Sequence, residues 1–375
     1  MNFKKSLTPA ELEAILTPQL RLFLSVDVVG STAFKHRKAL EGESKPWLKF
    51  IHGFYTGFPE ICWRRVGEVQ AGDGPGTQLV KPYLWKALGD ELIFSVPLRH
   101  PSYTRLYLKA FRLSLIEAIK HWAGGERPLP ISFKGAAWLA GFPVFNSAVP
   151  LDVDKPLSAE SEHFDFVGPL IDIGFRLSRF ASPRKFVISA DIAWLITTQG
   201  DTAAMKFYYE GRESLKGVLN DRPYPIFWID CYEDNNDGNM LDFVEDKVIN
   251  RAAVAPENVR DLASAFLDSV GSSIPKPFFH GDGIPPKFQP PPSFAAGLAN
   301  AQDEIKKIYE ISYQEVENSR NPQEVEGEVT ALLENVRKTK PLKIKAPRSS
   351  KANRLTQKEN ATGVIDKEGI PPRRR

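Results

Sequence analysis

The sequence predicts an α/β (α+β) fold in which helices flank a mixed β-sheet. The first observation is a nearly continuous apolar run at residues 20–28, which is typical of a central strand covered on both faces. The second is a pair of apolar runs joined by Gly89-Asp90, which predicts a tight hairpin. Helical and extended patterns then alternate as far as residue 231, so helices and strands are expected to share one domain.

The elements follow from local signals. Thr8 can cap a first helix over 8–17, with Pro9 in its first turn. Ser31 can cap a long helix over 32–62, whose aromatic side chains at helical spacing indicate core packing. A polar loop broken by proline is expected over 141–162, strands at 66–69, 78–88, 91–96, 131–139, 186–188, 206–212 and 225–231, and helices at 101–122, 165–182 and 190–198.

The chain is expected to divide into four parts. Changes of composition predict an N-terminal helix over 1–19, a main domain over 20–232, a helical and Pro-rich extension over 233–338, and a basic, disordered tail over 339–375. The extension is expected to hold a Pro-rich spacer at 275–292 and helices at 256–271, 294–317 and 322–338.

Composition narrows the class of protein. The 375 residues are 42% hydrophobic and 25% charged, which is typical of a globular protein with a sizeable core. Cys62 and Cys231 have neither zinc-site nor disulfide-framework spacing, so a reducing, cytoplasmic location is expected. No run of eighteen apolar residues occurs, and the N-terminus lacks the apolar core of a secretory signal, so no membrane span is expected.

The charge is distributed unevenly. Residues 337–375 hold 13 Lys or Arg against 3 Asp or Glu, a formal charge of +10, so the remaining residues carry −7 of the total of +3. Such a tail is either a solvated extension or a contact for nucleic acid or a membrane surface. We expect a solvated extension and no stable nucleic-acid partner.

Two carboxylates are expected to meet at one end of the sheet. Asp27 ends the first strand just before a Gly-Ser-Thr turn, and Asp90 lies at the tip of the predicted hairpin. Two carboxylates repel one another unless a hard cation lies between them, and Mg²⁺ or Mn²⁺ with oxygen ligands is the usual occupant. The pair therefore predicts a two-metal nucleotide site.

A second charged group is expected on the helix over 165–182. Asp165, Asp172 and Arg176 are separated by seven and eleven residues, which places them on one helical face. The alternative is a solvated face that carries an ordinary i,i+4 pair between Asp172 and Arg176.

Four segments together resemble the class III nucleotidyl cyclases. VDVVGST is similar to that family's first metal motif, WKALGDE to its K-x-x-G-D segment, DFVGPLIDIGFR to its D-x-x-G-x-x-[VI]-N-x-[AG]-x-R motif, and GRESLKGVLNDRPYPIFWID to its closing hairpin. They occur in the family's order over about residues 20–231. Within the family the chain is most similar to the bacterial Pycsar-type pyrimidine cyclases.

The resemblance implies a role for each matching residue. Two divalent cations would be held by Asp27, Val28 and Asp90. Lys86 and Asp165 would recognise the base, Arg176 and Asp172 would stand at the transition-state positions, and Lys216, with Arg212 as second choice, would bind the triphosphate. Gly30, Ser31 and Thr32 open a helix, so their backbone amides suit phosphate oxygens.

The implied activity is conversion of UTP to cyclic UMP in antiphage defence, with the product read by a separate cyclic-nucleotide effector. The family's sites lie between two subunits, so a homodimer is implied. Cyclic CMP and cyclic AMP stay open as products, because Lys86 with Asp165 is the adenine-type signature. A narrowing aromatic, Phe54 or Tyr55, would let the same pair meet a pyrimidine edge.

Asp172 departs from the family, where most members have Asn. A charged carboxylate cannot donate a hydrogen bond, and it repels substrate phosphates. Either Asp172 has another role, such as orienting Arg176, or the transition state is held differently. This departure keeps a non-catalytic NTP-binding sensor open as the rival function.

Overall fold

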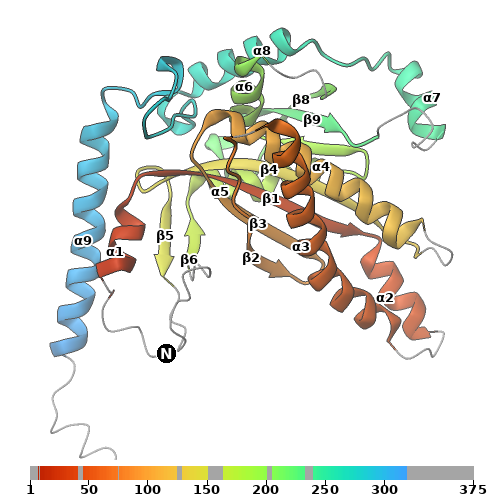
Figure 1. The fold of residues 1–375 in the computed structure, drawn as a ribbon, viewed down its shortest axis with the longest axis horizontal. Coiled ribbons are helices and arrows are strands. Elements are labelled where there is room, and N and C mark those ends of the chain that lie inside the picture. The colour runs from red at the N-terminus through yellow and green to blue at the C-terminus, as the bar shows by residue number, and fades with distance from the viewer. Residues whose placement is uncertain are drawn as a thin grey trace, which may run out of the picture. The chain divides into compact units, whose positions relative to one another are not determined.

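A seven-stranded sheet forms the centre of the chain in the computed structural model, which describes residues 7, 9–40, 45–74, 76–124, 129–150, 164–200, 205–232 and 240–318. The strand order is β2-β3-β1-β4-β7-β9-β8 (Figure 1), and only the β4–β7 pair is parallel. The sheet is therefore mixed and helices flank it, which confirms the predicted fold class. The strands are β1 (Gln19–Val29), β2 (Tyr83–Leu88), β3 (Glu91–Leu98), β4 (Ser132–Phe142), β7 (Lys185–Ile188), β8 (Phe207–Ser214) and β9 (Pro223–Asp230), and a separate pair consists of β5 (Ser147–Pro150) and β6 (Phe164–Val167).

Most expected helices are present with small shifts of their ends. The α-helices are α1 (Pro9–Leu16), α2 (Ser31–Leu40), α3 (Pro46–Asp73), α4 (Pro101–Ala118), α5 (Pro169–Leu177), α6 (Ala190–Gln199), α7 (Met240–Val248), α8 (Pro256–Val270) and α9 (Phe294–Asn318). Short helical turns lie at Ile119–Ala123, Ser178–Phe180, Leu219–Asp221, Gly271–Ser273 and Pro286–Phe288. Helix α7 had no sequence-based prediction, and the helix expected at 322–338 lies outside the described residues.

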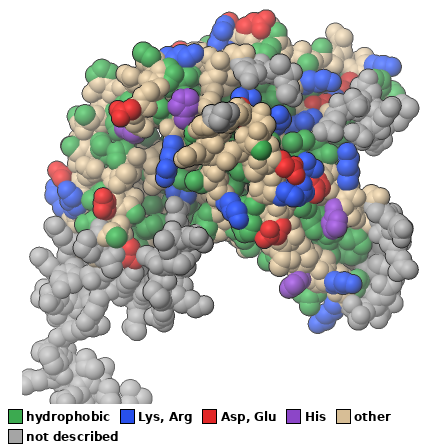
Figure 2. All heavy atoms as spheres, in the orientation of Figure 1, with side chains coloured by type: hydrophobic (Ala, Val, Ile, Leu, Met, Phe, Trp, Pro, Cys, Tyr) green, Lys and Arg blue, Asp and Glu red, His purple; other side chains and the backbone are tan. Residues whose placement is uncertain are grey.

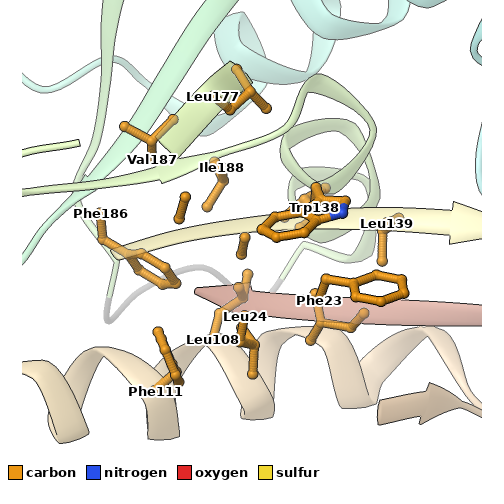
Figure 3. Packing of buried hydrophobic residues seen from close by; sticks show 14 of the residues in the cluster. Phe23, Leu24, Leu108, Phe111, Trp138, Leu139, Leu177, Phe186, Val187 and Ile188 are labelled. Atoms are coloured by element: carbon orange, nitrogen blue, oxygen red, sulfur yellow. The ribbon is translucent and has the colours of Figure 1, made fainter. Parts of the chain in front are cut away.

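Different helices pack on the two faces of the sheet. Figure 3 shows Leu108 and Phe111 of α4 on one side of β1 and β4, and Leu177 of α5 on the other. Side chains alternate along a strand, so Phe23 and Leu24 point to opposite faces. Phe23 stacks on Trp138 with ring centroids 5.5 Å apart, and Trp138 contacts α5. Asp27 is an even number of residues from Phe23 and therefore lies on the α5 face.

A glycine lets α5 pack directly on the sheet. A Cβ atom at Gly174 would lie 2.1 Å from the Trp138 ring, far inside van der Waals contact. Only glycine therefore allows this approach, and Arg176 stands two residues further along the same helix. The packing of α5 on Trp138 therefore fixes the position of the Arg176 backbone.

The predicted long helix over 32–62 is wrong in its extent. Residues 31–40 form α2, and α3 runs from Pro46 to Asp73, through the segment 66–69 that was expected to be a strand. Val66 and Val69 are buried and continue the helical spacing of Phe58 and Cys62. The buried face of one helix thus outweighs the local strand propensity of valine. The strand expected at 78–88 is likewise shorter, at Tyr83–Leu88.

The predicted helix over 165–182 is wrong at its start. Residues 164–167 form β6, paired with β5 inside the segment expected to be a loop, and α5 begins only at Pro169. Gly168 has φ of +143°, and a residue before proline is disfavoured in the helical region. Asp165 is therefore on a strand, and it does not share a helical face with Asp172.

The segments after residue 232 contribute to the same core. Helix α8 buries Val259 and Phe266 and packs against α6. In the Pro-rich segment Phe279 and Phe288 are buried, and the Phe288 ring lies 5.7 Å from that of Trp194. This segment is thus packed and is not a free spacer, which corrects the prediction. Residues up to 317 group as one compact unit. The proposed domain boundaries stay a prediction.

Helix α9 runs beside α1 (Figure 1), where the Gln302 amide donates to the Leu16 carbonyl at 3.0 Å. None of the helices described is both long enough and apolar enough to cross a bilayer. Figure 2 shows Lys and Arg side chains scattered among acidic and hydrophobic ones on one face.

Candidate active site

Asp27 lies between two charged neighbours in the sheet. Near the end of β1 it is paired in register with Glu91 of β3 on one side and with Lys134 of β4 on the other. Directly opposed side chains in an antiparallel pair lie on the same face and close together. The sheet register thus assembles two carboxylates and one ammonium group in a row.

Lys134 forms an ion pair with Asp27. Its Nζ lies 3.1 Å from Asp27 Oδ2, and the two side chains are 22% and 29% exposed. Burial raises the pKa of Asp27, the Lys134 ammonium acts against that rise, and the charge of Asp90 adds to it. The negative charge of Asp27 is therefore partly balanced by the Lys134 ammonium.

The hairpin tip brings Asp90 to the same place. The Val28 amide donates to the Asp90 carbonyl at 3.1 Å, and the Ser31 hydroxyl donates to the Asp90 carboxylate. Gly30 turns the chain between β1 and α2 with φ of +85°. A Cβ atom at this position would lie 2.9 Å from the Pro130 carbonyl. Strand β1, the hairpin and the start of α2 are thus joined at one point.

Helix α2 starts at this point. Its first backbone bond runs from the Phe34 amide to the Gly30 carbonyl at 2.9 Å. The amides of Ser31 and Thr32 precede that bond, as the first amides of any helix do. They are available to an anion, and the positive end of the helix dipole favours one.

Glu91 is a third carboxylate, which sequence reasoning missed. Its Oε1 accepts a hydrogen bond of 2.6 Å from the Ser25 hydroxyl. Burial raises the pKa of Glu91, and the charges of Asp27 and Asp90 add to the effect. Glu91 follows Asp90 directly in the GDE sequence, but only the register with Asp27 reveals its position.

The donor set fits a hard divalent cation. Across the described ranges no three His, Cys, Asp or Glu side chains are arranged to hold a metal ion by themselves. Asp27 and Asp90 supply two carboxylates, and Val28, whose backbone carbonyl the resemblance implies as a further ligand, follows Asp27 directly. Mg²⁺ is commonly bound by one or two carboxylates together with substrate phosphates and water. These oxygen donors suit Mg²⁺ or Mn²⁺ held jointly with a nucleotide.

Lys86 and Asp165 form a second charged group among the predicted site residues. Lys86 Nζ lies 2.7 Å from Asp165 Oδ1, and the side chains are 28% and 30% exposed. The Lys86 ammonium also lies 4.5 Å from the centre of the Trp85 ring, and Asp165 accepts a bond of 2.9 Å from the Phe166 amide. Strands β2 and β6 thus hold a donor and an acceptor side by side.

Arg176 and Lys216 form the third group. Arg176 Nε donates to the Lys216 carbonyl at 3.2 Å, and both side chains are exposed. Gly217, with φ of +74°, follows Lys216 in the loop between β8 and β9, and its amide donates to Asp221 at 3.3 Å. The Arg176 guanidinium thus lies against the backbone of the loop that carries Lys216. Arg212, the second choice, is exposed on β8.

Asp172 lies in the first turn of α5 and is exposed. It lines a groove with Gly168, Phe145 and residues 217–220. It forms no ion pair with any basic residue in the described ranges, so the i,i+4 pair with Arg176 is not made. Nothing in these contacts assigns Asp172 the role of orienting Arg176.

The two aromatic candidates for narrowing a base pocket differ in position. Phe54 is fully buried against Phe133, with ring centroids 5.5 Å apart. Tyr55 is partly exposed, and its hydroxyl donates to the Gly89 carbonyl at 2.6 Å. Tyr55 therefore lies beside the Asp90 turn, whereas Phe54 is a core residue.

The chain is similar in structure to catalytic domains of adenylyl and guanylyl cyclases. For the adenylyl cyclase CyaB from P. aeruginosa the identity is 12% and the TM-score 0.39, over 60% of this chain and 98% of that one. For the guanylate cyclase domain of RhGC from Catenaria anguillulae in complex with GTP the identity is 16% and the TM-score 0.38, over 57% of this chain and 97% of that one. No family profile and no curated protein sequence matches the chain. The similarity concerns the fold and assigns no role to a residue.

Proposed function

We propose that the protein is a metal-dependent pyrimidine nucleotide cyclase that converts UTP to 3′,5′-cyclic UMP and pyrophosphate. The observation that carries this proposal is the meeting of the Asp27 strand end, the Asp90 hairpin tip and the first turn of α2 at one point. A signalling role in antiphage defence, with a separate effector for the product, is proposed from the resemblance of the sequence motifs alone.

In the proposed reaction the ribose 3′-oxygen attacks the α-phosphorus, the bond to the β-phosphate bridging oxygen breaks, and pyrophosphate leaves. The 3′-hydroxyl proton is lost to solvent. When bound, two Mg²⁺ or Mn²⁺ ions supply Lewis-acid charge that activates this hydroxyl and the phosphates. Asp27, Asp90 and the Val28 carbonyl are the proposed protein ligands.

The protein's other groups bind and orient the nucleotide. The Ser31 and Thr32 amides at the positive end of α2 suit the phosphate oxygens. Arg176 and Lys216 offer positive charge for the oxygens on which negative charge develops, and fixed charges of this kind need no reorganisation during the reaction. Lys86 and Asp165 supply one donor and one acceptor for the edge of a base.

We propose that two copies complete each site. Asp27, Lys134 and Lys86 are 22% to 29% exposed, so this end of the sheet is open to a partner. Within the described part of one chain, no hydrogen bond or ion pair joins Arg176 or Lys216 to the Asp27 and Asp90 side chains. In a homodimer related by a two-fold axis, each copy would offer its Arg176 to the other's metal ligands.

The product assay tests this function. Purified protein is incubated with UTP and Mn²⁺, and the nucleotides are resolved by chromatography while pyrophosphate is measured in parallel. We expect cyclic UMP and pyrophosphate in equal amounts from the native protein and neither from Asp90→Asn. Turnover by Asp90→Asn at the native rate would remove Asp90 from the proposed metal site.

A non-catalytic NTP sensor is the second candidate. Asp172 favours it, since its exposed carboxylate opposes phosphate binding near the transition-state position. A sensor would bind UTP in calorimetry with Mn²⁺ and leave it intact over many hours. Formation of cyclic UMP under those conditions excludes the sensor.

A further inference from the structure

We infer that Lys134 is a positioning residue that neutralises Asp27 in the metal-free protein and thereby makes metal binding depend on the nucleotide. The inference rests on the proposed function, because it assumes that Asp27 is a metal ligand. It concerns an ammonium group that neither the sequence motifs nor the proposed reaction uses.

The geometry of the sheet creates this ion pair. Lys134 and Asp27 are register partners on β4 and β1, and the neighbouring pair is Val26 with Gly135. A Cβ atom at Gly135 would lie 2.7 Å from Leu115 and 3.2 Å from Phe186, so β4 is pressed tightly into the core at this position. The backbone under Lys134 therefore has little freedom to shift. From this fixed backbone position the ammonium reaches Asp27 Oδ2 at 3.1 Å.

The charges explain why an ammonium group is useful there. Asp27, Asp90 and Glu91 lie close enough for their charges to affect one another. Like-charged carboxylates destabilise one another when no cation is present. Lys134 is the basic side chain that pairs with this group in the described part of the chain. It lowers the repulsion without a metal ion.

The same contact opposes a metal ion. A divalent cation that binds Asp27 Oδ2 has to displace the Lys134 ammonium, which then remains nearby as a like charge. A triphosphate reverses the balance, because its negative charges attract both the ammonium and the metal ion. Free Mn²⁺ should therefore bind weakly, and Mn²⁺ should bind well once a nucleotide is present.

Neutralising Lys134 tests the inference through metal binding alone. Lys134→Gln removes the charge and keeps an amide donor for Asp27, and Lys134→Arg keeps the charge. Lys185→Gln is the matched control, because Lys185 is also 22% exposed and pairs with Glu210 at 2.8 Å, on strands β7 and β8. Mn²⁺ is titrated into each protein without nucleotide, and the free ion is followed by electron paramagnetic resonance.

We expect Lys134→Gln to bind Mn²⁺ roughly five- to tenfold more tightly than the native protein, and Lys134→Arg and Lys185→Gln to match the native protein. Adding a non-hydrolysable UTP analogue should tighten Mn²⁺ binding far more in the native protein than in Lys134→Gln. In a melting experiment, Mn²⁺ alone should raise the unfolding temperature of Lys134→Gln more than that of the native protein.

The outcomes separate two failures. If the native protein binds Mn²⁺ and Lys134→Gln binds it equally or more weakly, the role of Lys134 is wrong and the metal site stands. If neither protein binds Mn²⁺ with or without the nucleotide analogue, both the metal site and the inference are wrong. If Lys134→Gln fails to fold, Lys134→Met is measured in its place against the same expectations.

Discussion

Arg176 Nε donates a hydrogen bond to the backbone carbonyl of Lys216 across 3.2 Å, although 40 residues separate them. The bond joins the end of α5 to the loop between β8 and β9, so the Arg176 guanidinium and the Lys216 backbone form one unit. Because α5 is seated on Trp138 through Gly174, the position of this unit depends on the sheet core.

Arg176→Ala should lower kcat by about 10² to 10³ and change KM little, because the guanidinium is proposed to stabilise charge that develops only in the transition state. Steady-state kinetics with UTP measure both constants. Arg179→Ala, which removes an exposed arginine three residues further along, is the control and should leave both unchanged. A rise in KM alone would contradict the transition-state role.

Two inactive variants should complement one another if the site is shared between copies. Asp90→Ala and Arg176→Ala each spoil both sites of their own homodimer. Equal mixing with exchange of subunits gives about half mixed dimers, each with one intact site of two, and therefore about a quarter of native activity. The mixture is assayed for cyclic UMP after exchange. No recovery, with mixed dimers demonstrated by differently tagged chains, would place the whole site within one copy.

Gly174→Ala should destabilise the protein by about 1 to 3 kcal/mol and lower kcat, because a new methyl group would collide with Trp138 and displace α5. Chemical unfolding and kinetics provide the two measurements. Gly67→Ala is the matched control: Gly67 lies within α3, and its Cβ would meet nothing within 4 Å. That change should stabilise the protein by about 0.5 to 1 kcal/mol. Equal effects of the two substitutions would contradict the packing argument.

Asp191 should make stability depend on pH. Burial raises its pKa from 3.8 to about 6, so between these values the folded protein holds a proton that the unfolded chain has lost. The free energy of unfolding should therefore fall as pH rises from about 4 to 6, by at most about 3 kcal/mol. Melting temperatures across this range measure the slope.

Asp191→Asn should remove that slope and raise the melting temperature at pH 8, since an amide oxygen can still accept the bonds from Ser189 and the Ile192 amide. Asp261→Asn, on the exposed face of α8, should leave the slope as it is. An unchanged slope in Asp191→Asn would assign the pH dependence to other groups.

Local signals in the sequence were sufficient for the centre of the fold. The apolar run of β1 and the Gly89-Asp90 turn are short-range features, and both are present as predicted. The resemblance names Lys86 and Asp165 as base-recognising residues, but it did not predict the ion pair between them, which is made by two strands far apart in sequence. The helix predicted from periodicity was wrong at Asp165. The seven- and eleven-residue spacing to Asp172 and Arg176 suggested one helix, but Asp165 lies on β6. Gly168-Pro169 was the available signal for a break.

Lys134 could not have been singled out from the sequence. A lone lysine in a strand is ordinary, and its partner depends on the register between β1 and β4. Register is set by packing of residues far apart in the chain, such as Phe23 against Trp138, and no local pattern encodes it. The same limit hid the position of Glu91 beside Asp27.

The Asp27 and Asp90 carboxylates are proposed to serve the cyclisation of a pyrimidine nucleotide. The most direct measurement gives the purified protein equal concentrations of UTP, CTP, ATP and GTP with Mn²⁺ and quantifies every cyclic nucleotide by mass spectrometry. We predict cyclic UMP as the main product, with none formed by Asp27→Ala. Absence of any cyclic nucleotide from the native, metal-loaded protein would exclude the proposed cyclase activity, and cyclic AMP as the main product would exclude a pyrimidine substrate.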